Sequence, residues 1–87
     1  MAKVLLVDDE LTMVQMVGDL LRREGHEVFP FTNGQPAIQA LTTQSPDLVI
    51  TDLFLDKTRA HGLEILKKAR EQNPPPVVIV ITGFGSI

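Results

Sequence analysis

The sequence contains no cysteine, tryptophan or tyrosine, and its only aromatic residues are four phenylalanines. The absence of cysteine excludes disulfide bonds and thiolate metal sites. With so few aromatic side chains, the core must consist mainly of Leu, Ile and Val. No apolar run approaches the ~20 residues that a membrane-spanning helix needs, and the N-terminus has no apolar signal-peptide segment. These absences predict a cytoplasmic protein.

The chain also has little net charge, with a formal value of -3 over 87 residues. A nucleic-acid-binding module normally carries a basic patch, so we do not expect this segment to bind DNA or RNA. The length is enough for one compact domain and too short for two. The sequence therefore predicts a single globular unit, residues 1–87.

Strand-like and helix-like segments alternate along the chain. Apolar runs without polar alternation, which are typical of strands covered on both faces, dominate the predicted strands. The predicted strands are residues 3–7, 27–31, 48–51 and 77–81. The predicted helices are residues 11–24, 35–43 and 62–72, the last with Leu63, Ile65, Leu66 and Ala69 facing inward. This alternation predicts an α/β fold with a parallel sheet.

Polar side chains follow three of the predicted strands. Asp8 and Asp9 come after the first strand, Asp52 after the third and Thr82 after the fourth. Right-handed crossovers bring the carboxyl ends of parallel strands to one edge, where ligands bind in open α/β sheets. Carboxylate oxygens of this kind suit Mg²⁺. The sequence therefore predicts a shallow magnesium site at this edge.

A simpler explanation exists for each of these residues. Asp8, Asp9 and Glu10 could cap and charge the first turn of the helix that follows, at ~0.3–1 kcal/mol each. Asp52 could likewise cap a strand end, and Thr82 could be a turn hydroxyl. The simple explanation is weakest for the acids taken together, because it leaves their placement after two separate apolar strands to coincidence.

Four motifs in register resemble the receiver domain of bacterial two-component response regulators. They are "VLLVDDE", "PDLVITDL", "GLEIL" and "VVIVITGFGSI". The ending "TGFGSI" is especially similar to receivers that precede sigma-54-dependent activator ATPases. The resemblance implies a flavodoxin-like, doubly wound sheet with the strand order 2-1-3-4 over this chain.

The resemblance also implies a role for each site residue. Asp52 would be the phosphoacceptor, with a sensor histidine kinase or a phosphotransfer protein as the phosphohistidine donor. Asp9 would bind Mg²⁺ directly and Asp8 mainly through water, with Asp52 itself and the backbone carbonyl of Phe54 as further ligands. Thr82 would contact the phosphoryl group. The chain would be a signalling module that regulates an output domain, with self-catalysed phosphotransfer and no conventional enzymatic turnover.

Two departures from the family pattern stand out. Leu55 and Asp56 follow the acceptor strand where the family usually has Met-Pro, in a loop about two residues longer than usual. The sequence also stops at Ile87, whereas the family continues with a helix, a strand that ends in a phosphate-contacting lysine, and a last helix. We therefore expect a partial receiver domain whose ability to be phosphorylated without this lysine is in question.

Such a partial domain would leave the strand at 77–81 on the edge of the sheet and part of one sheet face bare. An apolar edge strand is a template for pairing with another chain. We therefore expect self-association, either through this strand edge or through the bared face. A folded monomer at micromolar concentration would contradict this expectation.

Two other functions fit parts of the sequence. A phosphohydrolase of the haloacid-dehalogenase type also uses a strand-end aspartate, but it expects a second acid two residues later, where this chain has Phe54. Alternatively, the chain could be a self-associating fragment with a vestigial, non-signalling site.

Overall fold

The fold alternates strand and helix in a computed structural model, which describes residues 1–52 and 60–81. The strands are β1 (Lys3–Val7), β2 (Glu27–Phe31), β3 (Leu48–Asp52) and β4 (Val77–Ile81). The helices are α1 (Leu11–Arg23), α2 (Gly34–Gln44) and α3 (Ala60–Arg70). All seven predicted elements are confirmed, with boundaries within two residues of those expected. The largest difference is α3, which begins and ends two residues earlier than predicted.

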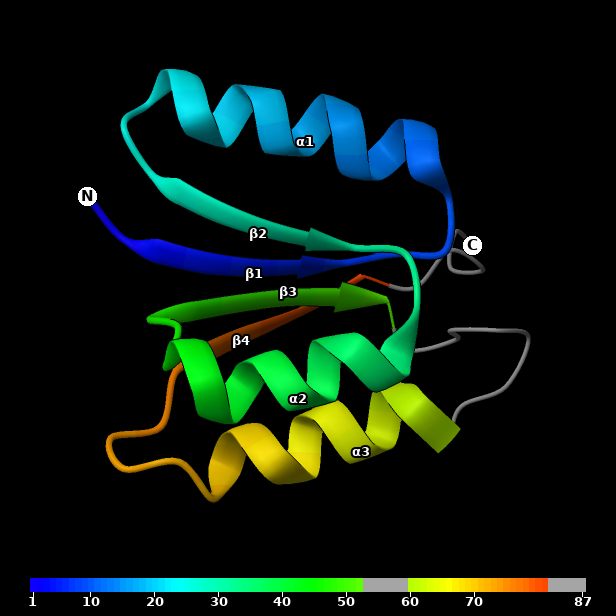
Figure 1. The fold of residues 1–87 in the computed structure, drawn as a ribbon, viewed down its shortest axis with the longest axis vertical. Helices are drawn as coiled ribbons and strands as arrows, with labels where there is room; N and C mark the ends of the chain where they lie inside the picture. Colours follow the sequence, from blue (N-terminus) through cyan, green and yellow to red (C-terminus); the bar gives the residue numbers. More distant parts are fainter. Residues whose placement is uncertain (53–59, 82–87) are drawn as a thin grey trace.

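The four strands form one parallel sheet in the order β2-β1-β3-β4. Leu5 in the middle of β1 pairs with Phe29 of β2 on one side and Val49 of β3 on the other. The sheet is covered by α1 on one face and by α2 and α3 on the other (Figure 1). The predicted α/β architecture and the strand order implied by the resemblance are both confirmed.

The core lies in two layers because successive side chains of a strand point to opposite faces of the sheet. Leu5, Leu41 and Ile65 belong to the layer between the sheet and the pair α2–α3. Leu6 and Val14 belong to the layer under α1. β1 is buried on both faces, which explains why its sequence is apolar without alternation.

One inward assignment in α3 is wrong. Ile65 and Ala69 are fully buried, but the Leu63 side chain is 52% exposed. At 3.6 residues per turn, Leu63 lies well over 90° around the helix from both buried residues, so it faces away from the core. The apolar stripe of α3 is thus narrower than its composition indicates.

Gly18 offers a way to stabilise α1. A Cβ built at this position would lie 3.4 Å from Arg22 Nη1 and 3.8 Å from side-chain atoms of Leu6 and Val28, which are ordinary contacts or contacts with a flexible group. Because Ala is favoured over Gly inside a helix, we expect Gly18→Ala to raise the free energy of unfolding by about 0.5–1 kcal/mol. Urea unfolding with an unchanged m-value is the measurement.

Gly25 provides the matched control for this substitution. It follows α1 with a φ of +90°, a conformation that a side chain disfavours, although a Cβ added there would have no atom within 4 Å. Gly25→Ala should therefore lower the free energy of unfolding by about 1 kcal/mol. Equal effects of the two substitutions would contradict this account of α1.

Candidate functional site

The acidic residues singled out in the sequence lie at the carboxyl edge of the sheet. Asp8 and Asp9 follow β1, and Asp52 is the last residue of β3. β1 and β3 are neighbours, and Val7 pairs with Thr51, so Asp8 and Asp52 extend adjacent strands at the same level. β2 lies on the other side of β1, which makes the boundary between β1 and β3 the point where the strand order reverses. Ligand sites in open α/β sheets lie at this point.

Three carboxylates gather there. One oxygen from each of Asp8, Asp9 and Asp52 lies within 4.8 Å of the other two. Asp8 is 7% exposed and Asp52 8% exposed, whereas Asp9 is open to solvent. The structure thus brings together the three acids that the sequence places after two separate strands.

Backbone hydrogen bonds hold Asp8 in place. Its N–H donates to the carbonyl oxygen of Phe31 at 3.1 Å, which ties the end of β1 to the end of β2. Its Oδ1 accepts a hydrogen bond from the N–H of Glu10 at 2.9 Å. This side-chain contact with the backbone two residues later is a common Asp turn, and turn chemistry alone could have predicted it from the sequence. The role of Phe31 could not be found from the sequence, because it depends on strand pairing.

A side-chain hydrogen bond from Thr51 is made to the backbone of Asp52. The hydroxyl of Thr51, which is fully buried, donates to the carbonyl oxygen of Asp52 at 3.0 Å. This contact satisfies a polar group at the end of β3 without using the carboxylate of Asp52.

The structure supports only part of the simpler explanation, in which the first three acids cap and charge the start of α1. The N-cap of α1 is Glu10, with φ -91° and ψ 111°, and no side chain forms a capping hydrogen bond there. The first turn of α1 contains no acidic residue. The reason is that Asp8 already binds the N–H of Glu10, one residue before the helix begins, and so does not reach the first helical N–H groups.

Burial raises the pKa of Asp8 above its usual value of 3.8, because a buried carboxylate loses water that stabilises its charge. The hydrogen bond from the Glu10 N–H acts in the opposite direction. The negative charges of Asp52, Asp9 and Glu10 add to the rise. The site therefore carries crowded negative charge that a cation would relieve.

The three acids fit a small, hard cation. Mg²⁺ prefers oxygen ligands at ~2.1 Å, so two of its ligand oxygens are at most ~4.2 Å apart. The separations within 4.8 Å in this cluster need only a small side-chain adjustment, or one intervening water, to satisfy this geometry. Asp8, Asp9 and Asp52 are thus the described residues that could hold Mg²⁺.

Two of the predicted site residues, Phe54 and Thr82, lie outside the described residues. The same holds for Leu55 and Asp56, which depart from the family pattern. The metal ligand expected from the Phe54 carbonyl and the phosphoryl contact expected from Thr82 therefore stay predictions.

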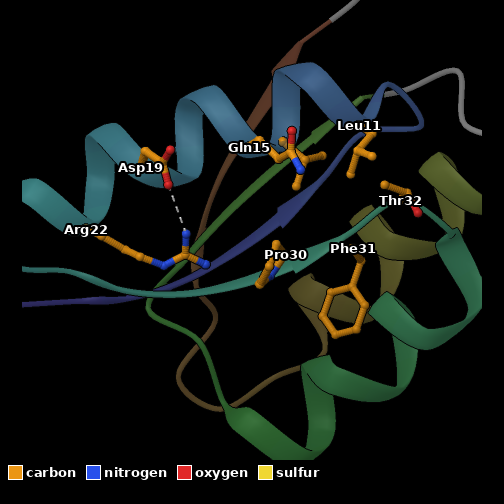
Figure 2. Close-up of a pocket in the computed structure, with 8 residues that line it drawn as sticks. Leu11, Gln15, Asp19, Arg22, Pro30, Phe31 and Thr32 are labelled. Carbon is orange, nitrogen blue, oxygen red and sulfur yellow. Dashed lines mark hydrogen bonds and ion pairs between the residues drawn. The ribbon is translucent and has the colours of Figure 1, made fainter.

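A groove of about 550 Å³ lies elsewhere, between α1 and the outer edge of β2. Figure 2 shows Leu11, Gln15 and Arg22 of α1 on one side of it and residues 30–32 on the other. Arg22 forms an exposed ion pair with Asp19 at 3.5 Å, an interaction worth under about 1 kcal/mol. The described lining residues include none of the three clustered acids, so the groove is separate from the carboxylate site.

A parallel sheet of this strand order, with clustered carboxylates where the order reverses, defines a receiver-type α/β domain. The chain matches the family described as response regulator receiver domain over residues 4–87. It therefore belongs to this family, which agrees with the resemblance and not with the haloacid-dehalogenase alternative. None of the described helices is long and apolar enough to cross a membrane.

Individual relatives agree with this assignment. The chain is 39% identical over 84 residues to the probable transcriptional regulatory protein TcrX of Mycobacterium tuberculosis, covering 97% of this chain and 35% of TcrX. The crystal structure of NtrX from Brucella abortus in complex with ATP has a TM-score of 0.84 and 35% identity, over 99% of this chain and 20% of that one. The relatives thus include receivers of the sigma-54 activator type.

A third comparison is with TrrA of Thermotoga maritima, a response regulator solved in complex with Mg²⁺-BeF. It has a TM-score of 0.82 and 28% identity, covering 98% of this chain and 72% of that one. The chain spans 35% of the length of TcrX, 33% of PhoP of Bacillus subtilis and 19% of the transcriptional regulatory protein GlrR of Escherichia coli.

Proposed function

We propose that residues 1–87 form part of a receiver domain that accepts a phosphoryl group on Asp52 in the presence of Mg²⁺. The donor would be a phosphohistidine of a sensor histidine kinase or a phosphotransfer protein in the cytoplasm. The observation that carries this proposal is the gathering of Asp8, Asp9 and Asp52 oxygens within 4.8 Å where the strand order reverses. Membership of the receiver family supports the choice of Asp52, at the end of β3, as the acceptor.

The proposed reaction is a phosphoryl transfer from nitrogen to oxygen. A carboxylate oxygen of Asp52 attacks the phosphorus, and the P–N bond breaks as the new P–O bond forms. The imidazole nitrogen of the donor keeps the electron pair and takes up a proton. A bound Mg²⁺ would neutralise charge on the phosphoryl oxygens.

The chain's own residues would hold the cation and the acceptor in position. Asp9, the exposed acid, is proposed as a direct Mg²⁺ ligand, and Asp8 as a ligand acting mainly through water. The hydrogen bonds of Asp8 to Glu10 and Phe31 support its role as a fixed anchor. Fixed positioning matters because phosphoryl transfer depends on alignment and charge neutralisation more than on protein covalent chemistry.

The proposed module would act through a separate output domain. Matches to transcriptional regulators such as TcrX support regulation of transcription as the output. The domain would then be a signalling element that contributes its own phosphotransfer chemistry.

Beryllofluoride, which imitates a phosphoryl group on an aspartate, tests this proposal. In an amide NMR spectrum, Mg²⁺ with beryllofluoride should shift the signals of Asp9, Glu10 and Asp52 beyond the shifts caused by Mg²⁺ alone. Asp47, which precedes β3, and Gln72, which follows α3, lie at the end of the domain where the strands begin, away from the three acids. Their signals should not shift and serve as the internal control. A folded protein whose spectrum is unchanged by beryllofluoride would instead support the vestigial site.

A further inference from the structure

Thr51 is a buried polar residue beside the carboxylate cluster. In residues 1–52 and 60–81, the buried polar or charged residues are Asp8, Thr51 and Asp52. Asp8 and Asp52 belong to the cluster, whereas Thr51 has no carboxylate and is fully buried. Thr51 pairs with Val7, the residue before Asp8, so all three lie at the same end of β1 and β3. The buried polar groups of the described chain are therefore concentrated at the candidate site.

The side chain of Thr51 lies in the core layer between the sheet and the pair α2–α3. Thr51 pairs with Val7 and follows Val49 by two residues, and both valines belong to that layer. A valine has nearly the same shape as a threonine and would suit these apolar neighbours better, because burying a hydroxyl is costly unless it is hydrogen-bonded. Packing therefore explains the shape of the Thr51 side chain but not its hydroxyl.

The hydroxyl of Thr51 holds the main chain of the next residue. It donates to the carbonyl oxygen of Asp52 at 3.0 Å. This contact restrains rotation about the bond between the Cα and the carbonyl carbon of Asp52. Strand pairing restrains the main chain on the other side, because Thr51 lies opposite Val7 of β1 and Val80 of β4. The Cα of Asp52, from which the carboxylate projects, is thus held from both directions.

We propose that Thr51 is a positioning residue for the carboxylate of Asp52. Its hydroxyl acts through the carbonyl oxygen of Asp52, fixes the direction in which this side chain leaves β3, and so keeps the carboxylate near Asp8 and Asp9. This role rests on the proposed function, in which Asp52 accepts the phosphoryl group and is one of the acids that could hold Mg²⁺. Both tasks need accurate placement, since reacting groups must be held within about 0.5 Å of their productive positions.

A restraint on Asp52 matters because the neighbouring charges repel its carboxylate. Oxygens of Asp8 and Asp9 lie within 4.8 Å of an oxygen of Asp52, and the charge of Asp52 contributes to the raised pKa of Asp8. Movement of Asp52 away from the cluster would relieve this repulsion in the metal-free protein. Because Thr51 restrains the main chain, Asp52 responds mainly by rotation of its side chain, and its carboxylate stays within reach of a cation.

Thr51→Val and Thr51→Ser test this role because they remove different parts of the side chain. Valine keeps the shape and loses the hydroxyl, whereas serine keeps the hydroxyl and leaves a small cavity in place of a buried methyl group. In Mg²⁺ titrations followed by the amide NMR signals of Asp9 and Glu10, we expect the Kd of Thr51→Val to be about 10-fold weaker and that of Thr51→Ser to stay within about 2-fold of the wild type. The rate of labelling by a small phosphoramidate should also fall about 10-fold in Thr51→Val alone.

Thr42→Val is the matched control for Thr51→Val. The hydroxyl of Thr42 donates to the carbonyl oxygen of Gln39, also at 3.0 Å, but Thr42 is exposed in the last turn of α2. This variant should bind Mg²⁺ and be labelled like the wild type. Urea unfolding of each variant separates positioning from stability, because the cavity in Thr51→Ser lowers stability without removing the hydroxyl.

The possible outcomes distinguish the role of Thr51 from the proposed function. Equal Mg²⁺ affinity and labelling rate in Thr51→Val and the wild type would overturn the role of Thr51 and leave the proposed function intact. Losses in Thr51→Ser as large as those in Thr51→Val would also overturn it, because they would follow from packing and not from the hydroxyl. A wild type that neither binds Mg²⁺ nor accepts a phosphoryl group would overturn the proposed function, and the role of Thr51 with it.

Discussion

Replacing Asp52 with Asn is expected to abolish phosphorylation of this chain by a small phosphoramidate donor in the presence of Mg²⁺. The amide has no carboxylate oxygen to attack phosphorus, yet it matches the carboxylate in size, so the end of β3 should keep its structure. Intact-mass measurement should detect one added phosphoryl group on the wild type and none on Asp52→Asn. The expected effect is a complete loss of labelling.

Asp47 supplies the matched control for Asp52→Asn. It precedes β3 at the opposite edge of the sheet, is exposed, and accepts a hydrogen bond from the N–H of Lys3 at 2.8 Å. Asp47→Asn keeps an acceptor there and should be labelled like the wild type. Labelling of Asp52→Asn at the wild-type rate would assign the acceptor to another residue. A folded wild type that is never labelled would identify the site as vestigial.

Mg²⁺ is expected to stabilise the folded chain. At a separation of 4.8 Å each pair of carboxylates repels by about 1 kcal/mol even with water-like screening. A cation bound among them replaces this repulsion with attraction and binds only the folded state. At ten times its Kd, Mg²⁺ should add about 1.4 kcal/mol to the free energy of unfolding. For a domain of this size, that corresponds to a rise in Tm of roughly 5–10 °C.

Asp8→Asn should separate metal binding from general salt effects. The amide oxygen can still accept the hydrogen bond from Glu10, but one of the buried charges is gone. The metal-free variant should be more stable than the metal-free wild type at neutral pH, and Mg²⁺ should raise its Tm much less. Asp47→Asn should respond like the wild type. If NaCl at the same ionic strength raised the Tm of the wild type as much as Mg²⁺ does, this result would contradict specific Mg²⁺ binding.

The pH dependence of these effects follows from the raised pKa of Asp8. The folded state binds this proton more tightly than the unfolded state, so in the metal-free protein the contribution of Asp8 to stability falls as pH rises from 3.8 through the raised pKa. Below 3.8 the neutral Asp8 resembles Asn, and the wild type and Asp8→Asn should converge in stability. Mg²⁺ competes with the same proton, so its stabilising effect should be present above the raised pKa and lost below it.

Strong local patterns carried most of the fold prediction. Residues 4–7 and 48–50 are apolar without alternation, and such short runs are typical of strands buried on both faces of a parallel sheet. Asp8, Asp9 and Asp52 follow these runs. Because the carboxyl ends of parallel strands lie at the same edge of a sheet, this placement was enough to predict that the three acids lie there together. The roles of these acids, and those of Phe54 and Thr82, came from the resemblance and stay predictions.

The sequence left open whether the first three acids only cap α1. The structure shows no side-chain capping hydrogen bond there, and the Asp8 carboxylate instead accepts a hydrogen bond from the N–H of Glu10. The error in α3 concerns Leu63. Leu63 was expected to face inward because it is one of several apolar residues in α3. Which side of α3 is buried depends on its packing against the sheet and α2, and Leu63 lies outside that side.

The sequence by itself determined the order of elements, the parallel sheet and the edge at which the acids emerge, because these follow from hydrophobic patterning and the handedness of crossovers. Only the tertiary structure decided that oxygens of Asp8, Asp9 and Asp52 approach within 4.8 Å, that Asp8 is buried, and that the N–H of Asp8 donates to the carbonyl oxygen of Phe31. These features depend on strand register and on contacts between residues more than 20 positions apart, which no local pattern records.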